Sequence, residues 1–551
     1  MRLFRWQLVI ALLGTALIAA VLGYAALSLA TEVVPEQGGT FTEGVIGNPQ
    51  AINPILCGYN QVDCDLSALL FRGLTRLNER GEVVPDLAER WEVSDDGLEY
   101  TFHLRQGIRW HDGAPFTAQD VAFTIKAIQD ATYGAVPHLT RFWKDISVLV
   151  DDEATVRFIL PEPLAPFLDA TGIGILPRHL LASVPAEAFA RAEFNTQPIG
   201  TGPFQVEEVS ALHLTLVPNP YWPGPRPHLQ RLEFRFYPDP QSLLEAYKKG
   251  EILAVSRVYP DQIPEASALP NLNLYPARLS GYVLVYLNLS DATNLPFFGQ
   301  REVRQALLYA LDRQALVDEV LNGQGIVAHG PILPDTWAYW DGATRYPYDP
   351  GHAQELLDAA GWVDRDGDGI RERDGRRLEF RLTTNDDPIR QRLAEAIAAQ
   401  WRKVGVGATP QSVSFARLVG EFLAPRHFDA VLAGLEFWGD PDPYPLWHST
   451  QATGLGQNYS GWALREADEA MEAARRTSDL HERIRLYRRF QELFAQEVPA
   501  LLLYYPVYTY GVDAKVRGVQ VPPLNTPADR FTTVADWYME TKRVLVGLGT
   551  R

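Results

Sequence analysis

Residues 100–121 read YTFHLRQGIRWHDGAPFTAQDV, and this stretch combines the patterns of a strand, a turn and the start of a helix. Apolar and polar residues alternate over 99–104, as in a half-buried strand. Glycines mark a turn over 107–113. Thr117 can cap a helix with Asp120 at its third position. The stretch therefore predicts a strand and a helix joined by a tight turn, in a domain of mixed α/β structure.

The same mixture of patterns continues on both sides of this stretch. Strands are expected over residues 40–47, 155–160, 212–218, 232–237, 282–288 and 500–510. Helices are expected over 65–73, 240–249, 302–321, 350–360, 388–404 and 464–496, the last broken near Ser478. Because 551 residues exceed what one core usually serves, we expect two or three domains.

The bulk composition is that of a globular protein, with 46% hydrophobic and 21% charged residues. The formal net charge of -18 disfavours nucleic acid and anionic membrane surfaces as partners, because like charges repel. The same charge is also a common means of keeping a protein soluble.

The N-terminus predicts export. Arg2 and Arg5 precede an uncharged apolar run from about Trp6 to Ala30. The run is long enough to span a bilayer as a helix, and the two arginines favour a cytoplasmic start. We expect an uncleaved anchor, with signal cleavage after Ala30 as the alternative. Lipid attachment is excluded because the run contains no cysteine, and the rest of the chain is placed outside the cytoplasm.

Cys57 and Cys64 are the only cysteines. An even pair in an exported protein suggests a disulfide that closes a short loop. A zinc site would need more ligands than this pair offers, and the spacing is not that of a zinc motif.

Motifs for catalysis are absent. The sequence contains no G-x-S-x-G, H-E-x-x-H or phosphate-binding glycine loop, and its 11 histidines are scattered. A catalytic triad can be assembled from distant segments, so a secreted hydrolase stays an alternative. We expect a protein that is not an enzyme.

One acidic loop resembles a calcium loop in its spacing. Asp364, Asp366 and Asp368 are followed by a glycine, and Glu372 stands at the ninth position. Position twelve is Gly375 instead of the bidentate glutamate that such loops use. An acidic, glycine-rich hairpin is the alternative. No cofactor is predicted apart from this possible structural calcium ion.

Six segments, in order along the chain, carry a resemblance to a known family. They are 70–77 (LFRGLTRL) with 85–91 (PDLAERW), 100–121, 198–204 (PIGTGPF), 218–222 (PNPYW), 288–313 with VRQALLYALDR, and 428–449 (FDAVLAGLEFWGDPDPYPLWHS). Together they resemble the extracytoplasmic solute-binding proteins of family 5, which are the oligopeptide, dipeptide and nickel receptors of ABC importers. The resemblance covers the chain from Gly39 almost to its end.

The resemblance implies a two-lobed periplasmic-binding-protein-like fold of class II, with a hinge and an additional inserted domain. The implied division is an anchor and linker at 1–38, lobe 1 at 39–76, 195–280 and 505–551, an inserted domain at 77–194, and lobe 2 at 281–504. Such proteins close over a ligand between their lobes, and a membrane permease recognises the closed form. We expect a monomer that captures small peptides for an ABC importer.

The resemblance also implies ligand-binding positions. After the first strand these are Gly58, Tyr59 and Asn60, in a loop that a Cys57–Cys64 bridge would brace. Further positions are Tyr133 in the inserted domain and Tyr282 beside the hinge. The main pocket segment is 434–442, with Gly434, Leu435 and Glu436 offering backbone to an extended peptide.

The acidic residue that binds a peptide amine in this family is displaced here. When positions are counted forward from Gly434, Trp438 stands where the family has this acidic residue. When they are counted back from Pro443, Asp440 is the nearest acidic residue. Trp438 and Trp337 would suit a sugar or planar ligand. The alternative for Trp438 is a place in the hydrophobic core. A nickel chelate, haem, opine or oligosaccharide therefore stays open as the solute. A sensor of the same fold is a further alternative.

Overall fold

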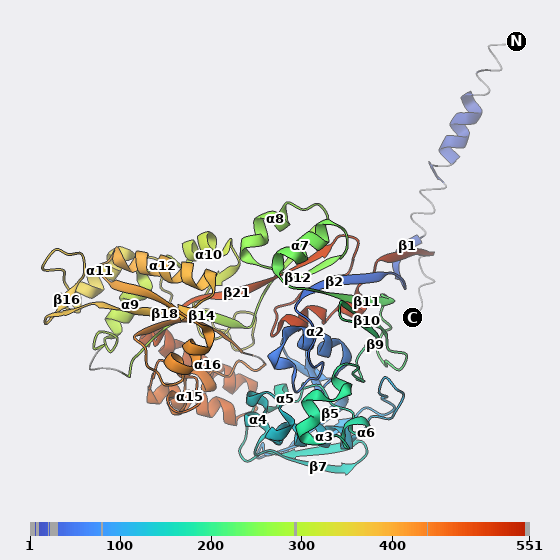
Figure 1. The fold of residues 1–551 in the computed structure, drawn as a ribbon, viewed down its shortest axis with the longest axis horizontal. Coiled ribbons are helices and arrows are strands. Elements are labelled where there is room, and N and C mark those ends of the chain that lie inside the picture. The colour runs from blue at the N-terminus through green and yellow to red at the C-terminus, as the bar shows by residue number, and fades with distance from the viewer. Residues whose placement is uncertain are drawn as a thin grey trace.

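The computed structural model describes residues 6, 10–19, 21–22, 31–78, 81–290, 295–437 and 439–545. Figure 1 shows two bodies side by side, with lobe 2 at one end and lobe 1 with the inserted domain at the other. Part of the predicted N-terminal membrane segment lies outside the described residues. Among the helices that are described, none is long and apolar enough to cross a bilayer.

One large sheet runs through both lobes. Its order is β19-β18-β20-β14-β21-β12-β2-β11-β10-β9, with β13 and β15 also paired to β21. The long strand β21 (Ala500–Asp513) pairs with β14 of lobe 2 through residues 500–504 and with β13 of lobe 1 through residues 507–513. The second crossing is the short link from Arg278 to Gly281, where Leu279 bridges to Leu524. These two crossings form the hinge.

Lobe 1 surrounds one end of this sheet. A buried triad holds its elements together, in which Arg530 pairs with Glu43 of β2 and Asp65 of α2 at 2.6 and 2.7 Å. Its elements are β2 (Thr40–Ile46), α2 (Gln61–Leu70), β3 (Thr75–Leu77), β9 (Phe204–Val209), β10 (His213–Pro218), β11 (Arg231–Tyr237), α7 (Pro240–Lys248), β12 (Ala254–Val258), α8 (Ile263–Ser267) and β13 (Leu272–Arg278).

The inserted domain packs helices on the separate four-stranded sheet β5-β6-β8-β7. The aromatic side chains of Trp143, Phe158 and Phe167 meet in its core. Its elements are β4 (Val83–Pro85), β5 (Ala88–Val93), β6 (Glu99–Leu104), α3 (Ala118–Gln129), α4 (Pro137–Trp143), β7 (Ser147–Asp152), β8 (Thr155–Ile159), α5 (Phe167–Ala170) and α6 (Arg178–Leu181).

The stretch 100–121 has the predicted structure. Asp120 accepts a hydrogen bond from the backbone N–H of Thr117 at 2.9 Å at the start of α3. Its other carboxylate oxygen accepts from the N–H of Arg178 at 2.9 Å and so fixes α6. Gly113 has a φ of +85°, which favours glycine, and Trp110 is fully buried. This stretch builds the inserted domain.

Lobe 2 covers both faces of its part of the sheet with helices. Leu393 and Trp401 of α12 pack on one face, and Phe490 and Phe494 of α16 pack on the other. Its elements are β14 (Gly281–Leu287), α9 (Arg301–Tyr309), α10 (Arg313–Leu321), β15 (Gly325–Val327), α11 (Pro350–Ala359), β16 (Glu372–Arg373), β17 (Arg376–Arg377), β18 (Glu379–Asn385), α12 (Pro388–Arg402), β19 (Gly407–Val413), α13 (Phe415–Arg417), β20 (Ala430–Glu436), α14 (Tyr444–Trp447), α15 (Arg465–Arg476) and α16 (Leu480–Glu497).

One predicted helix is wrong as a single element. The pattern over 302–321 forms two helices, α9 and α10, because Asp312 accepts a hydrogen bond from the N–H of Ala315 and caps the second. The predicted break near Ser478 is confirmed, since α15 ends at Arg476 and α16 begins at Leu480.

A strand that precedes lobe 1 and the last strand of the described chain form a separate ribbon. Strands β1 (Thr31–Glu36) and β22 (Glu540–Leu545) pair in antiparallel register. Figure 1 shows this ribbon at the edge of lobe 1, and the N-terminal helix stands away from it.

Candidate ligand-binding site

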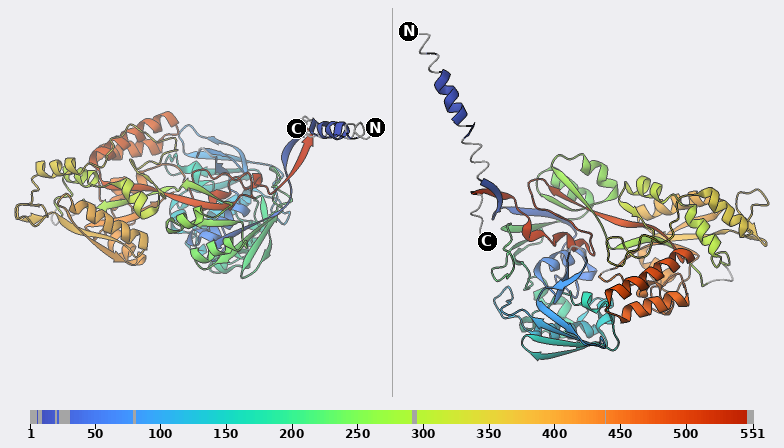
Figure 2. Two further views of the ribbon diagram at one scale, coloured as in Figure 1. Left: turned by 90° about the horizontal axis from the view of Figure 1, so that it is seen from above. Right: turned by 180° about the vertical axis from the view of Figure 1, so that it is seen from behind.

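A charged cluster lies where lobe 2 meets the inserted domain. Figure 2 shows α15 and α16 beside that domain. Within lobe 2, the Asp440 carboxylate receives two hydrogen bonds from the Arg483 guanidinium, at 2.6 and 2.7 Å. Both side chains are less than 10% exposed. Such a two-point pair fixes the orientation of both groups.

A second pair lies next to the first. Asp442 pairs with Arg475 of α15 at 3.0 Å and also accepts a hydrogen bond from the N–H of Tyr444 at 3.1 Å. Burial raises the pKa of Asp442 to about 6, with Arg475 opposing this shift and Asp440 adding to it. Asp442 therefore shapes the turn, as its position between prolines suggests, and is also part of the buried cluster.

The inserted domain brings a third carboxylate to this cluster. Asp169 of α5 approaches Gly439, where a Cβ atom would lie 3.1 Å from the Cβ of Asp169. The N–H of Ala165 donates to the carbonyl of Arg475 at 2.8 Å, so the two domains are in backbone contact here. The described structure contains no ion pair between Asp169 and a cation.

The electrostatics at Asp169 follow from this placement. Burial and, next in size, the charge of Asp440 together raise the pKa of Asp169 to about 7, and Arg483 opposes both effects. Three carboxylates and two guanidinium groups meet here, and the excess charge is negative.

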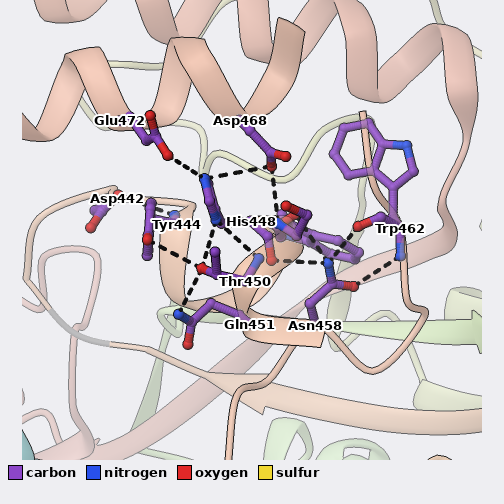
Figure 3. Close-up of polar contacts among 11 residues, drawn as sticks. Asp442, Tyr444, His448, Thr450, Gln451, Asn458, Trp462, Asp468 and Glu472 are labelled. Carbon is purple, nitrogen blue, oxygen red and sulfur yellow. Dashed lines mark hydrogen bonds and ion pairs between the residues drawn. The ribbon is translucent and has the colours of Figure 1, made fainter. Parts of the chain in front are cut away.

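A polar network holds the segment that follows Asp442. His448 is almost fully buried and contacts Thr450 at 2.8 Å and Glu472 of α15 at 3.1 Å (Figure 3). Asn458 donates to the carbonyls of Trp447 and Trp462 and accepts from the N–H of Trp462. These contacts fix the segment against α15, the helix that carries Arg475.

The segment 434–436 presents a free strand edge. On one side, β14 pairs with β20 along its whole length. On the other side, β18 pairs only with Ala430 and Val431, and Thr384 reaches the carbonyl of Leu432. Of the described strands, none pairs with Gly434, Leu435 or Glu436 on that side. This edge can accept an additional extended chain.

The predicted residues of lobe 1 lie together at a pocket whose lining includes no residue of the charged cluster. Tyr59 and Asn60 line a pocket of about 490 Å³ whose lining residues all belong to lobe 1 and the inserted domain. A Cβ atom on Gly58 would contact Val136, which places the loop against the chain that follows Tyr133. Tyr133 packs on Phe189 instead of standing free.

The predicted disulfide is confirmed. Cys57 and Cys64 are bonded, with Cα atoms 4.8 Å apart. The bridge joins the loop to the first turns of α2, whose N-cap is Asn60.

The predicted aromatic residues have different positions. Tyr282 is fully buried in lobe 2, where its hydroxyl accepts from the indole N–H of Trp447 at 2.9 Å. Trp337 lies at the charged cluster, with the Arg483 guanidinium 4.7 Å from its ring centre. Trp438 lies outside the described residues.

Arg483, Arg475 and Asp169 were missed by the sequence analysis. No local motif marks them, because the charged groups around each one come from segments that are distant in sequence. Trp337 and Asp440, which the sequence predicts as ligand-binding residues, meet at Arg483.

The acidic loop brings its candidate ligands together. Ligand atoms of Asp364, Asp366 and Glu372 lie within 4.8 Å of one another. Asp368, by contrast, pairs with Arg377. Calcium binding by this loop stays a prediction.

Comparisons with known proteins identify the class. The family model described as bacterial extracellular solute-binding proteins, family 5 Middle, matches residues 82–457. The chain therefore belongs to this family of solute-binding proteins, and the predicted two-lobed fold with an inserted domain is confirmed.

Three relatives illustrate the likeness. The oligopeptide-binding protein AppA of Bacillus subtilis is 31% identical over 500 residues, which are 89% of this chain and 90% of AppA. The structure of AppA with a nonapeptide matches with a TM-score of 0.71 at 30% identity, covering 92% of this chain and all of that chain. The dipeptide-binding protein of Escherichia coli is 30% identical over 510 residues, covering 87% and 91% of the two chains. The structure of NikZ from Campylobacter jejuni with Ni(L-His) matches with a TM-score of 0.72 at 29% identity, covering 91% and 99%.

Proposed function

We propose that this protein binds short peptides between its lobes and delivers them to the permease of an ABC importer. The excess of carboxylate at the contact between lobe 2 and the inserted domain carries the proposal. A peptide ammonium group placed between Asp169 and Asp440 would balance this charge and receive charge-assisted hydrogen bonds. Because the two carboxylates belong to different domains, the ammonium would also stabilise their contact.

The free edge of β20 supplies the second part of the site. A peptide with its amine near Asp440 can extend along residues 434–436 and pair with their backbone. Backbone pairing makes few demands on side chains, so it suits a receptor for many peptide sequences. The similarity to AppA, an oligopeptide-binding protein, and to the dipeptide-binding protein supports this ligand class.

The receptor role follows from the hinge. Ligand binding shifts the equilibrium between open and closed lobes by its differential affinity for the closed form. In this proposal the protein releases its ligand unchanged and acts as a monomer outside the cytoplasm. The apolar N-terminal segment exports it and holds it at the membrane.

Calorimetry with peptides tests the proposal. Asp169→Asn is the informative variant because it removes a charge without leaving a described cation unpaired. We expect it to weaken binding of free-amine di- to pentapeptides by roughly tenfold or more. Its melting temperature should be unchanged or higher, because a like-charge contact with Asp440 is removed.

The matched control is Asp95→Asn, which removes an exposed carboxylate from the same domain. It should bind like the wild type. N-acetylated peptides, which lack the ammonium, should bind weakly to all three proteins. Absence of binding by wild type with every peptide pool would reject the peptide ligand.

The second candidate is an amino-acid metal chelate. The similarity to NikZ, solved with Ni(L-His), favours it. Native mass spectrometry of the purified protein distinguishes the candidates by the mass of the co-purified ligand.

A further inference from the structure

One short turn of lobe 1 touches lobe 2 at two points. The turn Pro260–Gln262 follows β12 and leads into α8. The carbonyl of Pro260 accepts a hydrogen bond from the side-chain amide of Asn322 at 3.0 Å, and the carboxylate of Asp261 pairs with the guanidinium of Arg392 at 2.8 Å. Figure 1 shows α10, the helix that Asn322 ends, next to α7 and α8. Asn322 and Arg392 belong to lobe 2, so both contacts join the lobes.

The partners on the two sides are anchored in different hydrophobic cores. The side-chain amide of Gln262 donates to the carbonyl of Pro240 at 2.8 Å, at the start of α7, and Ile263 packs on the small core of α7 and α8. Arg392 lies on α12, where its neighbour Leu393 is buried in the core of lobe 2. The two sides of each contact therefore move with different lobes.

Both contacts lie at the sheet edges that carry the predicted ligand segments. Strands β2 and β12 are parallel, so the turn after β12 leaves the sheet at the same edge as the loop with Tyr59 and Asn60. In lobe 2, β18 and β20 are parallel, and α12 follows β18 at the edge where residues 434–436 end β20. A hydrogen bond is lost when its two atoms are more than about 3.5 Å apart. Lobes that rotate apart at these edges therefore lose both contacts.

The backbone at Asn322 separates its local role from its contact with lobe 1. Asn322 ends α10 with a φ of +48°, in the left-handed region that glycine and asparagine tolerate best. Glycine would end the helix as well as asparagine does, but only a side chain reaches Pro260. The fold of lobe 2 therefore does not need the amide group, whereas the contact with lobe 1 does.

We propose that Asn322 and Arg392 form a latch with the turn Pro260–Gln262 that lets the lobes close before a ligand binds. The latch rests on the hinged receptor role of the proposed function, but it uses only groups of this chain and so depends on no particular ligand. Where the open form predominates, a latch that raises the closing constant raises the apparent ligand affinity by the same factor.

Each contact of the latch is exposed, which limits its strength. The Arg392 and Asp261 side chains are 46% and 58% exposed, and such a pair shifts an equilibrium by up to roughly fivefold. The hydrogen bond of Asn322 adds up to roughly tenfold. The latch therefore favours closure without locking the lobes, and a bound ligand can still shift the equilibrium further.

Single-molecule fluorescence energy transfer measures the open and closed populations of the ligand-free protein. Dyes on Asp95→Cys of the inserted domain and Lys403→Cys of lobe 2 report the distance between the two bodies, and both positions are exposed. The native cysteines do not react because they are bonded to each other. We expect wild type to visit the closed state. Asn322→Gly should lower the ratio of closed to open molecules by roughly two- to tenfold and leave the melting temperature unchanged, because glycine suits a positive φ.

The ion pair has its own test and a matched control. Arg392→Gln should lower the same ratio by up to roughly fivefold at low salt and have little effect in about 1 M salt, because salt screens exposed charges. The charge exchange Arg392→Asp with Asp261→Arg should restore the ratio. The control is Arg489→Gln, because Arg489 has a similar exposure and pairs with Glu466 inside lobe 2 at 2.6 Å. It should leave the ratio unchanged.

The outcomes separate the latch from the proposed peptide function. Calorimetry with trialanine should show that Asn322→Gly weakens binding by the same factor by which it lowers the closed-to-open ratio. If wild type does not close without ligand, or if Asn322→Gly and Arg392→Gln close as often as wild type, the latch is wrong and the peptide function stands. If no peptide binds, the peptide function fails, and the populations of the ligand-free protein still decide the latch.

Discussion

Asp440 and Arg483 form a two-point ion pair inside lobe 2, with hydrogen bonds of 2.6 and 2.7 Å. The pair neutralises itself and leaves Asp169, across the domain contact, as the carboxylate in excess. Closure without ligand still buries the Asp169 carboxylate beside Asp440, whose charge raises the pKa of Asp169 more than Arg483 lowers it. Closure over an ammonium group instead gives this carboxylate a charge of opposite sign. This difference can couple ligand binding to closure.

The affinity for free-amine peptides should depend on pH. In the ligand-free closed form the pKa of Asp169 is raised to about 7, so Asp169 is mostly protonated at pH 5. Binding an ammonium requires the ionised form, and affinity should rise by roughly tenfold between pH 5 and 7. It should fall again as the peptide amine loses its proton near pH 8. Calorimetry across this pH range measures both the rise and the fall in affinity.

The Asp169→Asn variant should lose most of the rise in peptide affinity between pH 5 and 7. It should keep the fall in affinity near pH 8. An unchanged rise in this variant would show that another group controls it, with Asp442 as the next candidate because its pKa is raised to about 6.

Breaking the ion pair should destabilise lobe 2. Arg483→Met leaves the Asp440 carboxylate buried without its partner, which costs about 3–5 kcal/mol in the free energy of unfolding. The double variant with Asp440→Leu should recover most of this loss. Denaturant unfolding of the single and double variants measures the difference. Equal stability of the Arg483→Met variant and wild type would contradict the buried pairing.

Gly439→Ala should impair closure. Gly439 has a φ of +74°, and the added Cβ atom would lie 3.1 Å from the Cβ of Asp169. The backbone strain alone costs about 1 kcal/mol, and the contact with Asp169 exists only when the domains meet. Small-angle scattering with saturating peptide should show a larger radius of gyration than for wild type. Gly454→Ala is a control, because Gly454 also has a positive φ but no atom lies within 4 Å of the added Cβ.

Removing the disulfide should lower stability moderately. Cys57 and Cys64 are seven residues apart, and closing so short a loop is worth about 2.5 kcal/mol in the chain-entropy estimate. The Cys57→Ser, Cys64→Ser double variant should therefore melt at a lower temperature than wild type. An identical melting temperature in calorimetry would show that the bridge does not constrain the unfolded chain.

Local patterns predicted the elements well where a single segment decides them. The alternation over 99–104 matches β6, and the cap at Thr117 matches the start of α3. The pattern over 302–321 failed because apolar periodicity continues across the break, whereas Asp312 caps a new helix. Periodicity alone could not reveal that cap.

The site was only partly predictable for a physical reason. Asp440 and Trp337 were named from a family pattern and composition, but their shared partner, Arg483, lies on α16, far from both in sequence. Tyr282 was expected at the ligand and is instead fully buried beside Trp447. Contacts between segments distant in sequence leave no local signal.

A crystal structure of the protein with a bound tripeptide tests the central claim most directly. We expect the N-terminal amine of the peptide within about 3 Å of carboxylate oxygens of Asp169 and Asp440, which is the usual hydrogen-bond range. We also expect the peptide backbone to lie along residues 434–436. A peptide bound with its amine away from both carboxylates, or outside the contact between lobe 2 and the inserted domain, would contradict the account.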